Sequence, residues 1–497
     1  MGHTIQTKYG LLRGQARDGV VSFLGIPYAA SPTGALRFQA PVPPQPWDGL
    51  RDAFEYGPTP PKPDYPPPFD TLFAEPNVAG EDWLNLNIWT PDAALASMGA
   101  ADLPVMVWIH GGAFANGNSA IPLYDGHSFA RDGVVLVSLN YRLGVDGFAL
   151  LPGAPANRGL LDQIAALEWV RDNIAAFGGD PGNVTVFGES AGAMSVITLL
   201  AMPGAAGLFG KAVAQSGAAQ AAAVPADAAL VTAELGQALG IDGELTAGRL
   251  ARVGRGRLIA GQAAVRDALA ASADPARFGP SIVASTMPFI PVIDGDSLPE
   301  HPLASIAGGS GAEVTLMIGT NSDEFRTFLV PSGMAATVTD EVLASMGAAI
   351  GAPPGVLSAY RASRPEARPG DLLAALLTDR FFLLPAIALA QARPEGRART
   401  YFYEFAWQHP QVGAGHGLDV PFVFDNLAAP GAELVAGPDA PPGLAQEMHQ
   451  AWIRFARTGD PGWPAFDQSL PVRVFDEDGG GVRVDPHAVE RAAWPKG

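Results

Sequence analysis

The chain has 497 residues and a formal net charge of -19, which argues against nucleic acid and anionic membrane surfaces as partners. Hydrophobic residues make up 48 % and charged residues 16 %, a balance typical of a folded globular protein rather than a disordered one. No cysteine is present, which excludes disulfides, thiolate metal ligands and a cysteine nucleophile.

The first eight residues lack a basic segment followed by an apolar run, so we expect no secretory signal peptide. No stretch approaches the ~18 uninterrupted apolar residues of a membrane span. These features predict a cytoplasmic protein without a membrane anchor. Large α/β enzymes of this length often fold as one domain, so we predict a single domain over residues 1–497.

The N-terminal quarter alternates short β-like runs with turns. Residues 9–60 predict antiparallel strands at the edge of a sheet. Prolines crowd residues 59–76, which predicts an irregular surface loop. Residues 81–91 and 104–109 then read as strands, and the second is apolar enough to be central.

A glycine pair follows the predicted central strand, in His110-Gly111-Gly112-Ala113-Phe114. Glycines directly after a buried strand let backbone N–H groups face a ligand without side chains intervening. For the glycine pair alone, a plain strand-ending turn is the more ordinary explanation. The segments that follow favour one half of an oxyanion hole.

A helix is predicted over residues 159–177, because apolar residues recur there at helical spacing and Gly178-Gly179 supplies a stop. It lies between predicted strands at residues 134–139 and 184–187. Strand, helix and strand in this order indicate a right-handed parallel crossover, the signature of an α/β fold.

The strand at residues 184–187 enters Gly188-Glu189-Ser190-Ala191-Gly192, and a predicted helix follows. A Gly-x-Ser-x-Gly turn between strand and helix holds the serine in a strained conformation at the top of a sheet. Ser190 is therefore the candidate nucleophile. The N–H of Ala191, at the helix start, would face a developing oxyanion.

Two later regions, around residues 220–285 and 335–395, are rich in Ala, Leu and Gly with helical periodicity. We interpret them as helical excursions that cap the sheet rather than as separate domains. Asp227 is the expected N-cap of a helix over residues 228–239. Further strands are predicted at 314–319 and 400–405, and a helix at 444–457.

A serine nucleophile needs a base, and in α/β hydrolases the chain order is serine, acid, histidine. Of the eight histidines, His409 and His416 remain once those before the acid, near the termini or inside a helix are set aside. His416 is the better placed, in a glycine-lined loop after a strand.

The acid should follow the strand at 314–319, where Asp323 and Glu324 are adjacent. Either carboxylate could orient an imidazole and stabilise its cation, and position alone does not separate them. Two solvated loop carboxylates would be the ordinary explanation for such a pair.

The chain resembles the type-B carboxylesterases of the carboxylesterase and cholinesterase group, and most of all their bacterial members. The resemblance runs through Gly25-Ile26-Pro27-Tyr28-Ala29, Glu81-Asp82-Trp83-Leu84-Asn85-Leu86-Asn87, His110-Gly111-Gly112-Ala113-Phe114, Asn140-Tyr141-Arg142, Phe187-Gly188-Glu189-Ser190-Ala191-Gly192, Gln215-Ser216-Gly217, Asp323-Glu324, His416 and Trp452-Ile453-Arg454-Phe455-Ala456. It implies the α/β-hydrolase fold, a large mixed and mostly parallel sheet with helices on both faces.

The resemblance also implies roles for particular residues. It selects Glu324 as the acid beside Ser190 and His416, and it assigns the oxyanion hole to the N–H groups of Gly112, Ala113 and Ala191. Ser216, behind the triad, and Glu189, beside it, would support these groups. Arg37 with Glu81 and Arg142 with Asp162 match structural salt bridges of the family.

Two departures from the family pattern stand out. Trp83 replaces a cysteine of secreted members, which supports an intracellular bacterial enzyme. Ala113 stands where many members have a third glycine, but the backbone N–H is retained.

The expected function is that of a serine carboxylesterase working through an acyl-enzyme on small-molecule esters, with no cofactor or metal, as a monomer or small homo-oligomer. Ser285, Met287, Phe325 and Phe328 are candidate pocket residues for short to medium acyl and aromatic esters. Ser285 and Met287 match acyl-pocket positions that carry bulky aromatics in cholinesterases, which implies a roomier pocket. A carbamate or amide hydrolase with the same triad, and a non-catalytic binding module, remain alternatives.

Overall fold

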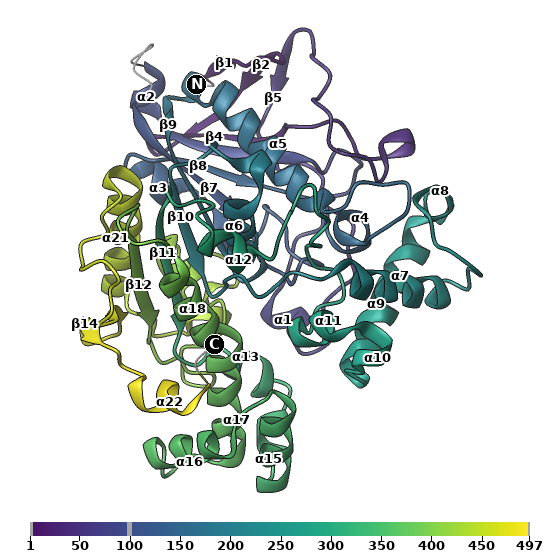
Figure 1. Ribbon diagram of the computed structural model, residues 1–497. Helices are drawn as coiled ribbons and strands as arrows, with labels where there is room; N and C mark the ends of the chain where they lie inside the picture. The colour runs from purple at the N-terminus through teal and green to yellow at the C-terminus, as the bar shows by residue number, and fades with distance from the viewer. Residues whose placement is uncertain (1–2, 97–101, 496–497) are drawn as a thin grey trace.

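The computed structural model describes residues 3–96 and 102–495, and its centre is an 11-stranded sheet in the order β14-β13-β12-β11-β10-β9-β7-β8-β6-β4-β3 (Figure 1). The strands from β13 to β8 in this order are parallel, and those at both edges are antiparallel. The predicted mixed, mostly parallel sheet of the α/β-hydrolase fold is therefore confirmed.

The strands have these bounds: β1 Thr4–Gln6, β2 Leu11–Arg13, β3 Gln15–Arg17, β4 Val20–Pro27, β5 Leu50–Asp52, β6 Asn85–Pro91, β7 Leu103–Ile109, β8 Val135–Leu139, β9 Gly179–Glu189, β10 Lys211–Gln215, β11 Thr315–Asn321, β12 Thr400–Phe405, β13 Pro471–Phe475 and β14 Gly481–Val484. β1, β2 and β5 form a separate small sheet. The prediction of antiparallel edge strands holds for β3 and β4, but β2 and β5 pair in parallel.

Side chains of the central strands alternate between two hydrophobic cores, because successive residues of a strand point to opposite faces. In β7, Val105, Val107 and Ile109 belong to one core, and Met106 and Trp108 belong to the other. All five are fully buried. The apolar run that predicted a central strand is thus explained by burial on both faces.

Helices cover both faces of the sheet (Figure 1). One face carries α5 Arg158–Asn173, α6 Ala191–Ala201, α12 Pro302–Ala307 and α18 Leu384–Ala392. The other carries α3 His127–Arg131, α19 Val420–Val423 and α21 Pro442–Thr458. Between β8 and β9, α5 forms the predicted crossover, and β7 lies between the two strands that it connects.

Two groups of helices project from this body, at the right and at the bottom of Figure 1. The first consists of α7 Pro225–Ala238, α8 Ala247–Leu250, α9 Arg255–Ala271, α10 Pro275–Phe278 and α11 Pro280–Ser285. The second consists of α13 Arg326–Leu329, α14 Met334–Thr337, α15 Asp340–Ala349, α16 Pro354–Ser363, α17 Pro369–Thr378 and the π-helix η5 Asp379–Leu383, which leads into α18. The remaining α-helices of the described residues are α1 Phe69–Leu72, α2 Asp92–Ala96, α4 Gly144–Phe148, α20 Ala432–Ala436 and α22 Ala488–Ala493.

The prediction that Asp227 is an N-cap is wrong. Helix α7 begins three residues earlier than predicted, at Pro225, and its N-cap is Val224. The Asp227 carboxylate instead accepts hydrogen bonds from the backbone N–H and the hydroxyl of Ser281, at 2.8 and 2.6 Å. Proline at the first helical position explains the earlier start, since its missing N–H is not needed there.

Residues 59–76, hereafter the strap, were expected to form an irregular surface loop, and this is only partly right. The strap contains the single-turn helix α1. The side chains of Lys62 and Glu75, at its two ends, are only 4 % and 8 % exposed and form an ion pair of 3.0 Å. This pair joins the two ends of the strap. Hydrogen bonds from Asn116 Nδ2 to the Pro63 carbonyl and from the Gly117 N–H to Glu75, both 2.7 Å, hold the strap against the body, where it becomes a wall of the candidate site.

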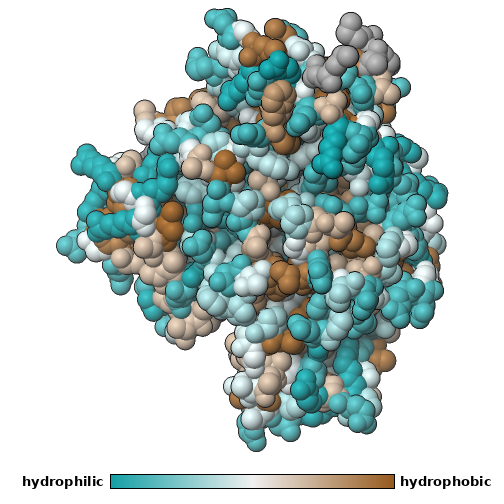
Figure 2. All heavy atoms as spheres, turned by 180° about the vertical axis from the view of Figure 1, so that it is seen from behind, coloured by the Kyte–Doolittle hydropathy of each residue, from teal (hydrophilic) through white to brown (hydrophobic). Residues whose placement is uncertain are grey.

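The back of the molecule, shown in Figure 2, is mainly hydrophilic and carries its apolar side chains in small groups. Among the residues that the structure describes, one continuous helical stretch, Pro369–Ala392, has the length and apolar character needed to cross a membrane. In this structure 67 % of its most apolar window is buried inside the protein, as in a core helix.

Candidate active site

Ser190 occupies the turn between β9 and α6 with φ 55° and ψ -122°, a conformation that L-residues rarely adopt. Two glycines permit the turn. A Cβ on Gly192 would lie 2.0 Å from the carbonyl oxygen of Ile109, and one on Gly188 would lie 2.6 Å from the same atom. The Ser190 N–H donates to the Gln215 carbonyl at 2.9 Å. Backbone packing therefore holds the strained residue in place.

A chain of hydrogen bonds joins the three residues expected to form the triad. His416 Nε2 lies 2.8 Å from Ser190 Oγ, and His416 Nδ1 lies 2.6 Å from Glu324 Oε2. Glu324 is fully buried, and its Oε1 accepts the Asn321 N–H at 2.9 Å. With Nδ1–H donating to the carboxylate, Nε2 is free to accept the serine proton.

The structure also separates Asp323 from Glu324, which the order of residues left open. Asp323 Oδ2 accepts the Ala414 N–H at 3.2 Å, and its own N–H donates to the Ala414 carbonyl at 2.9 Å. Asp323 thus anchors the loop that carries His416, while Glu324 contacts the imidazole. The other candidate base, His409, pairs through its backbone with Gly413 and is not part of this chain of contacts.

The oxyanion loop follows β7, and Gly112 and Ala113 both have positive φ, at 108° and 53°. Within the described residues, the N–H groups of Gly112 and Ala113 have no hydrogen-bond acceptor. Ala191 is the first residue of α6, so its N–H has no intrahelical acceptor either. The expected donors are therefore available to a ligand oxygen beside Ser190.

His110 contributes to this loop in a way that sequence reasoning did not find. Its ring is fully buried, and burial lowers the pKa of the imidazole to about 3, so the ring is neutral. Nδ1–H then donates to the Gly111 carbonyl at 2.8 Å, which orients the peptide group that carries the Gly112 N–H. The ring stacks on Tyr141, whose hydroxyl donates to the His110 carbonyl at 2.9 Å.

Glu189 places a second carboxyl group against His416. Its Oε1 lies 3.1 Å from His416 Nε2 and accepts no hydrogen bond in the described part of the chain, so the contact is electrostatic. Burial raises the pKa of the Glu189 carboxyl to about 8, although the imidazole opposes the shift. Burial also lowers the pKa of His416, but Glu189, Glu324 and Asp419 outweigh it and raise the value to about 9.

A buried polar cluster supports the triad from behind. Asp419 accepts hydrogen bonds from Gln215 Nε2 at 2.8 Å and from Asn321 Nδ2 at 3.4 Å. Trp452 Nε1–H donates to Gln215 Oε1 at 3.1 Å. Ser216 is buried with φ 54°, and its hydroxyl has no partner among the described residues. Sequence reasoning selected Ser216 but missed Asp419, which no local motif marks.

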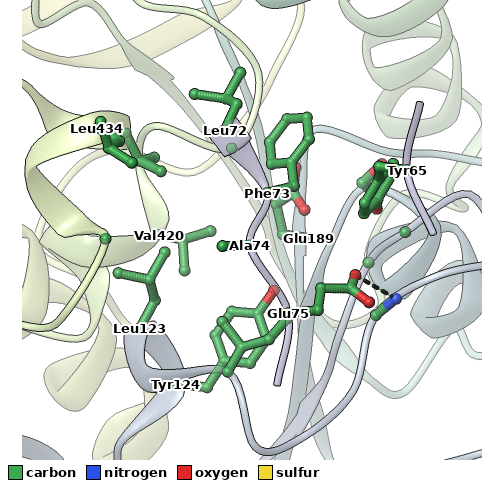
Figure 3. Close-up of a pocket in the computed structure, with 18 of the residues that line it drawn as sticks. Tyr65, Leu72, Phe73, Ala74, Glu75, Leu123, Tyr124, Glu189, Val420 and Leu434 are labelled. Carbon is green, nitrogen blue, oxygen red and sulfur yellow. Dashed lines mark hydrogen bonds between the residues drawn. The ribbon is translucent and has the colours of Figure 1, made fainter. Parts of the chain in front are cut away.

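The larger of two cavities at Ser190 has a volume of about 630 Å³. Figure 3 shows Leu123, Val420 and Leu434 on one side of it and Tyr65 on the opposite side. The strap and α20 supply much of this wall, including Leu72 and Phe73. Glu75, which also lines the cavity, accepts the Gly117 N–H at 2.7 Å.

The smaller cavity has a volume of about 310 Å³ and also reaches Ser190 and His416. All four predicted pocket residues, Ser285, Met287, Phe325 and Phe328, line it. Phe381 and Phe382 complete the wall, and the Phe382 ring lies 4.8 Å from the His416 ring. These two belong to η5, a π-helix that sequence periodicity does not reveal.

The structure confirms one of the two expected salt bridges. Arg142 Nη2 lies 2.7 Å from Asp162 Oδ1, and both side chains are buried. Arg37 pairs with Asp146 at 3.4 Å instead of with Glu81. Within residues 3–96 and 102–495, no group of three histidine, aspartate or glutamate side chains could hold a metal ion.

Comparisons of the sequence and the structure with known proteins place the chain in a family. The carboxylesterase family model matches residues 2–477. The para-nitrobenzyl esterase of Bacillus subtilis is 38 % identical over 98 % of this chain and 97 % of its own. The phenmedipham hydrolase of Pseudarthrobacter oxydans is 35 % identical over 96 % of both chains.

The crystal structure of a Geobacillus stearothermophilus carboxylesterase superposes with a TM-score of 0.84 at 36 % identity, covering 99 % of this chain and 100 % of the other. These matches favour ester hydrolysis over the carbamate or amide hydrolase and over the non-catalytic binding module. The chain belongs to the carboxylesterase family and is a hydrolase of small-molecule carboxylic esters.

Proposed function

We propose that Ser190, His416 and Glu324 carry out this hydrolysis through an acyl-enzyme. His416 Nε2 takes the Ser190 proton as Oγ attacks the ester carbonyl. The N–H groups of Gly112, Ala113 and Ala191 bind the oxyanion of the tetrahedral intermediate. His416 then gives the proton to the alkoxide as the alcohol leaves.

Water completes the cycle by the same route. It attacks the acyl-enzyme carbonyl and loses a proton to His416 Nε2. The second tetrahedral intermediate then collapses to the free acid as His416 returns the proton to the leaving Ser190 Oγ. Glu324 holds the imidazole by Nδ1 and stabilises its cation in both halves of the reaction.

One observation carries this proposal above the others: the unbroken hydrogen-bond chain from Ser190 Oγ through both ring nitrogens of His416 to Glu324, at 2.8 and 2.6 Å. This is the arrangement in which an unprotonated imidazole activates a serine hydroxyl. The two cavities meet at Ser190, so one can take the acyl group and the other the alcohol.

We assign the acyl group to the smaller cavity, where Ser285 and Met287 lie. Its phenylalanine walls suit short to medium acyl and aromatic esters, since flat apolar surfaces bury such groups well. The larger cavity would then receive the alcohol and leave room for a hindered one.

The direct test is Ser190→Ala, assayed with an aryl acetate and an alkyl ester. We expect kcat to fall roughly 10⁵-fold or more on both, because the nucleophile is removed. An organophosphonate should label the wild-type protein once, at Ser190, and leave the variant unlabelled. Hydrolysis at the wild-type rate by the variant would overturn the proposal.

A further inference from the structure

The smaller cavity contains one charged side chain in addition to the proposed base. Arg266, on α9, lines it together with Ser190 and His416, and no aspartate or glutamate of the described chain does so. Its side chain is 31 % exposed. Its Nε and Nη2 bind Asp267, the next residue, at 2.9 Å, and Nη1 makes no bond within the described residues. The guanidinium therefore keeps hydrogen-bonding capacity for a ligand.

A second donor lies one helical turn away. Gln262 precedes Arg266 by four residues on α9, so the two side chains share a face of the helix. Gln262 lines the same cavity and is 6 % exposed. Its Oε1 accepts the Val145 N–H at 3.1 Å, while Nε2 has no partner in the described part of the structure. An unsatisfied buried donor is costly unless a ligand supplies an acceptor.

The two cavities thus differ in charge. The larger is lined by two carboxyl groups, Glu75 and Glu189, and by no lysine or arginine among the described residues. The smaller is lined by Arg266 and the free amide of Gln262. The remaining wall of the smaller cavity is mostly aromatic and apolar.

We propose that the smaller cavity binds acyl groups that end in a carboxylate, so that monoesters of dicarboxylic acids are preferred substrates. The proposal rests on the function proposed above and on the assignment of the acyl group to this cavity. The apolar wall takes the carbon chain or ring of the diacid, and the free carboxylate pairs with Arg266 and accepts from Gln262. Charge-assisted hydrogen bonds of this kind are stronger than neutral ones.

The test compares ethyl esters that release the same alcohol. The monoethyl esters of glutaric, adipic and suberic acid are each paired with the ethyl ester of the monocarboxylic acid of the same chain length. Three lengths are used so that the carboxylate can reach the guanidinium in at least one. Because the protein carries a net charge of -19, every anionic ester meets the same general repulsion, so kcat/KM is compared between variants.

For Arg266→Gln we expect kcat/KM on the best diacid monoester to fall at least roughly tenfold, and kcat/KM on its neutral partner to stay within about twofold. Arg266→Lys keeps the charge and should lose less. Asp267→Asn removes the competing carboxylate, so it should raise kcat/KM on the diacid monoester about two- to threefold. Activity on the neutral ester shows that each variant is folded.

An equal fall on charged and neutral esters, or no change on either, would overturn the inference. So would a selective loss on esters whose alcohol carries the carboxylate, such as 6-acetoxyhexanoate, because the anion would then bind from the alcohol side. Ser190→Ala separates the two proposals. If it abolishes hydrolysis of all esters while Arg266→Gln leaves the ratio unchanged, the proposed function stands and only the preference for diacid monoesters fails.

Discussion

The proposed catalytic centre and the walls of the two cavities are built in different ways. The centre lies on the ends of buried strands and on the turns that follow them, and backbone contacts fix it: a Cβ on Gly192 would meet the Ile109 carbonyl at 2.0 Å. The walls come from the strap, from α9, α20 and η5, and from other segments outside the sheet. Few of these wall segments pack against the sheet itself.

This difference indicates where change is tolerated. A small displacement at Ser190 would break the geometry of attack, and displacements near 1 Å can cost about 100-fold in rate. A displaced wall alters which esters fit but leaves the hydroxyl, imidazole and N–H donors in place. We therefore expect substitutions in the centre to lower kcat for every ester, and substitutions in the walls to act on some esters only.

The largest expected effect on kcat separates two adjacent carboxylates, Glu324 and Asp323, of which only the first belongs to the proposed catalytic centre. Glu324→Gln should lower kcat by about 10³- to 10⁴-fold, because the amide no longer stabilises the imidazolium or its tautomer. Asp323→Asn, its matched control, should cost less than about tenfold, since Asp323 bonds the Ala414 N–H and the Gln408 side chain but does not contact the His416 ring. Steady-state kinetics on one aryl ester measures both. Equal losses in the two variants would contradict the assigned roles.

The second largest effect is expected in the pH dependence of kcat/KM. Since the surrounding carboxylates raise the pKa of His416 to about 9, kcat/KM should rise with pH between about 7 and 9 as the base loses its proton. Glu189 is ionised above its own pKa of about 8 and there favours the imidazolium, so Glu189→Gln should move the upper part of the acid limb to lower pH.

Glu341→Gln, a change at an exposed residue of α15, is the control for the pH profile and should leave it in place. An acid limb that stays at its wild-type position in Glu189→Gln would show that the 3.1 Å contact does not influence the base.

The smallest effect belongs to the strap. Glu75→Gln leaves Lys62 without its buried partner and loosens the wall of the larger cavity. We expect KM for esters of bulky alcohols to rise severalfold, while kcat for ethyl acetate changes less than about twofold. The double variant Lys62→Met with Glu75→Gln removes both charges and should recover part of the loss. A large fall in kcat on ethyl acetate would place the strap within the catalytic centre.

The sequence predicted the centre better than the walls for physical reasons. The turn that carries Ser190 requires small residues at fixed positions before and after the serine. Its motif is therefore short and can be recognised in the sequence. Glu324 was selected only through the family resemblance, since Asp323 has the same charge one position earlier. The expectation for Arg37 failed because its partner, Asp146, is 109 residues away and no pattern links them.

The walls depend on contacts between distant segments. Phe381 and Phe382 reach the cavity because η5 widens the helix by a π-turn, which the apolar sequence does not encode visibly. The prolines of the strap excluded long regular elements but gave no sign that Lys62 and Glu75 would be buried. The cytoplasmic location, the single-domain assignment and the oligomeric state stay predictions.

One measurement tests the central claim most directly: a crystal structure of the protein inhibited with an alkyl phosphonate, a mimic of the tetrahedral intermediate. We expect phosphorus bonded to Ser190 Oγ and one phosphonyl oxygen within about 2.7–3.1 Å of the N–H groups of Gly112, Ala113 and Ala191. An adduct on another residue, or a phosphonyl oxygen directed away from all three N–H groups, would contradict the mechanism.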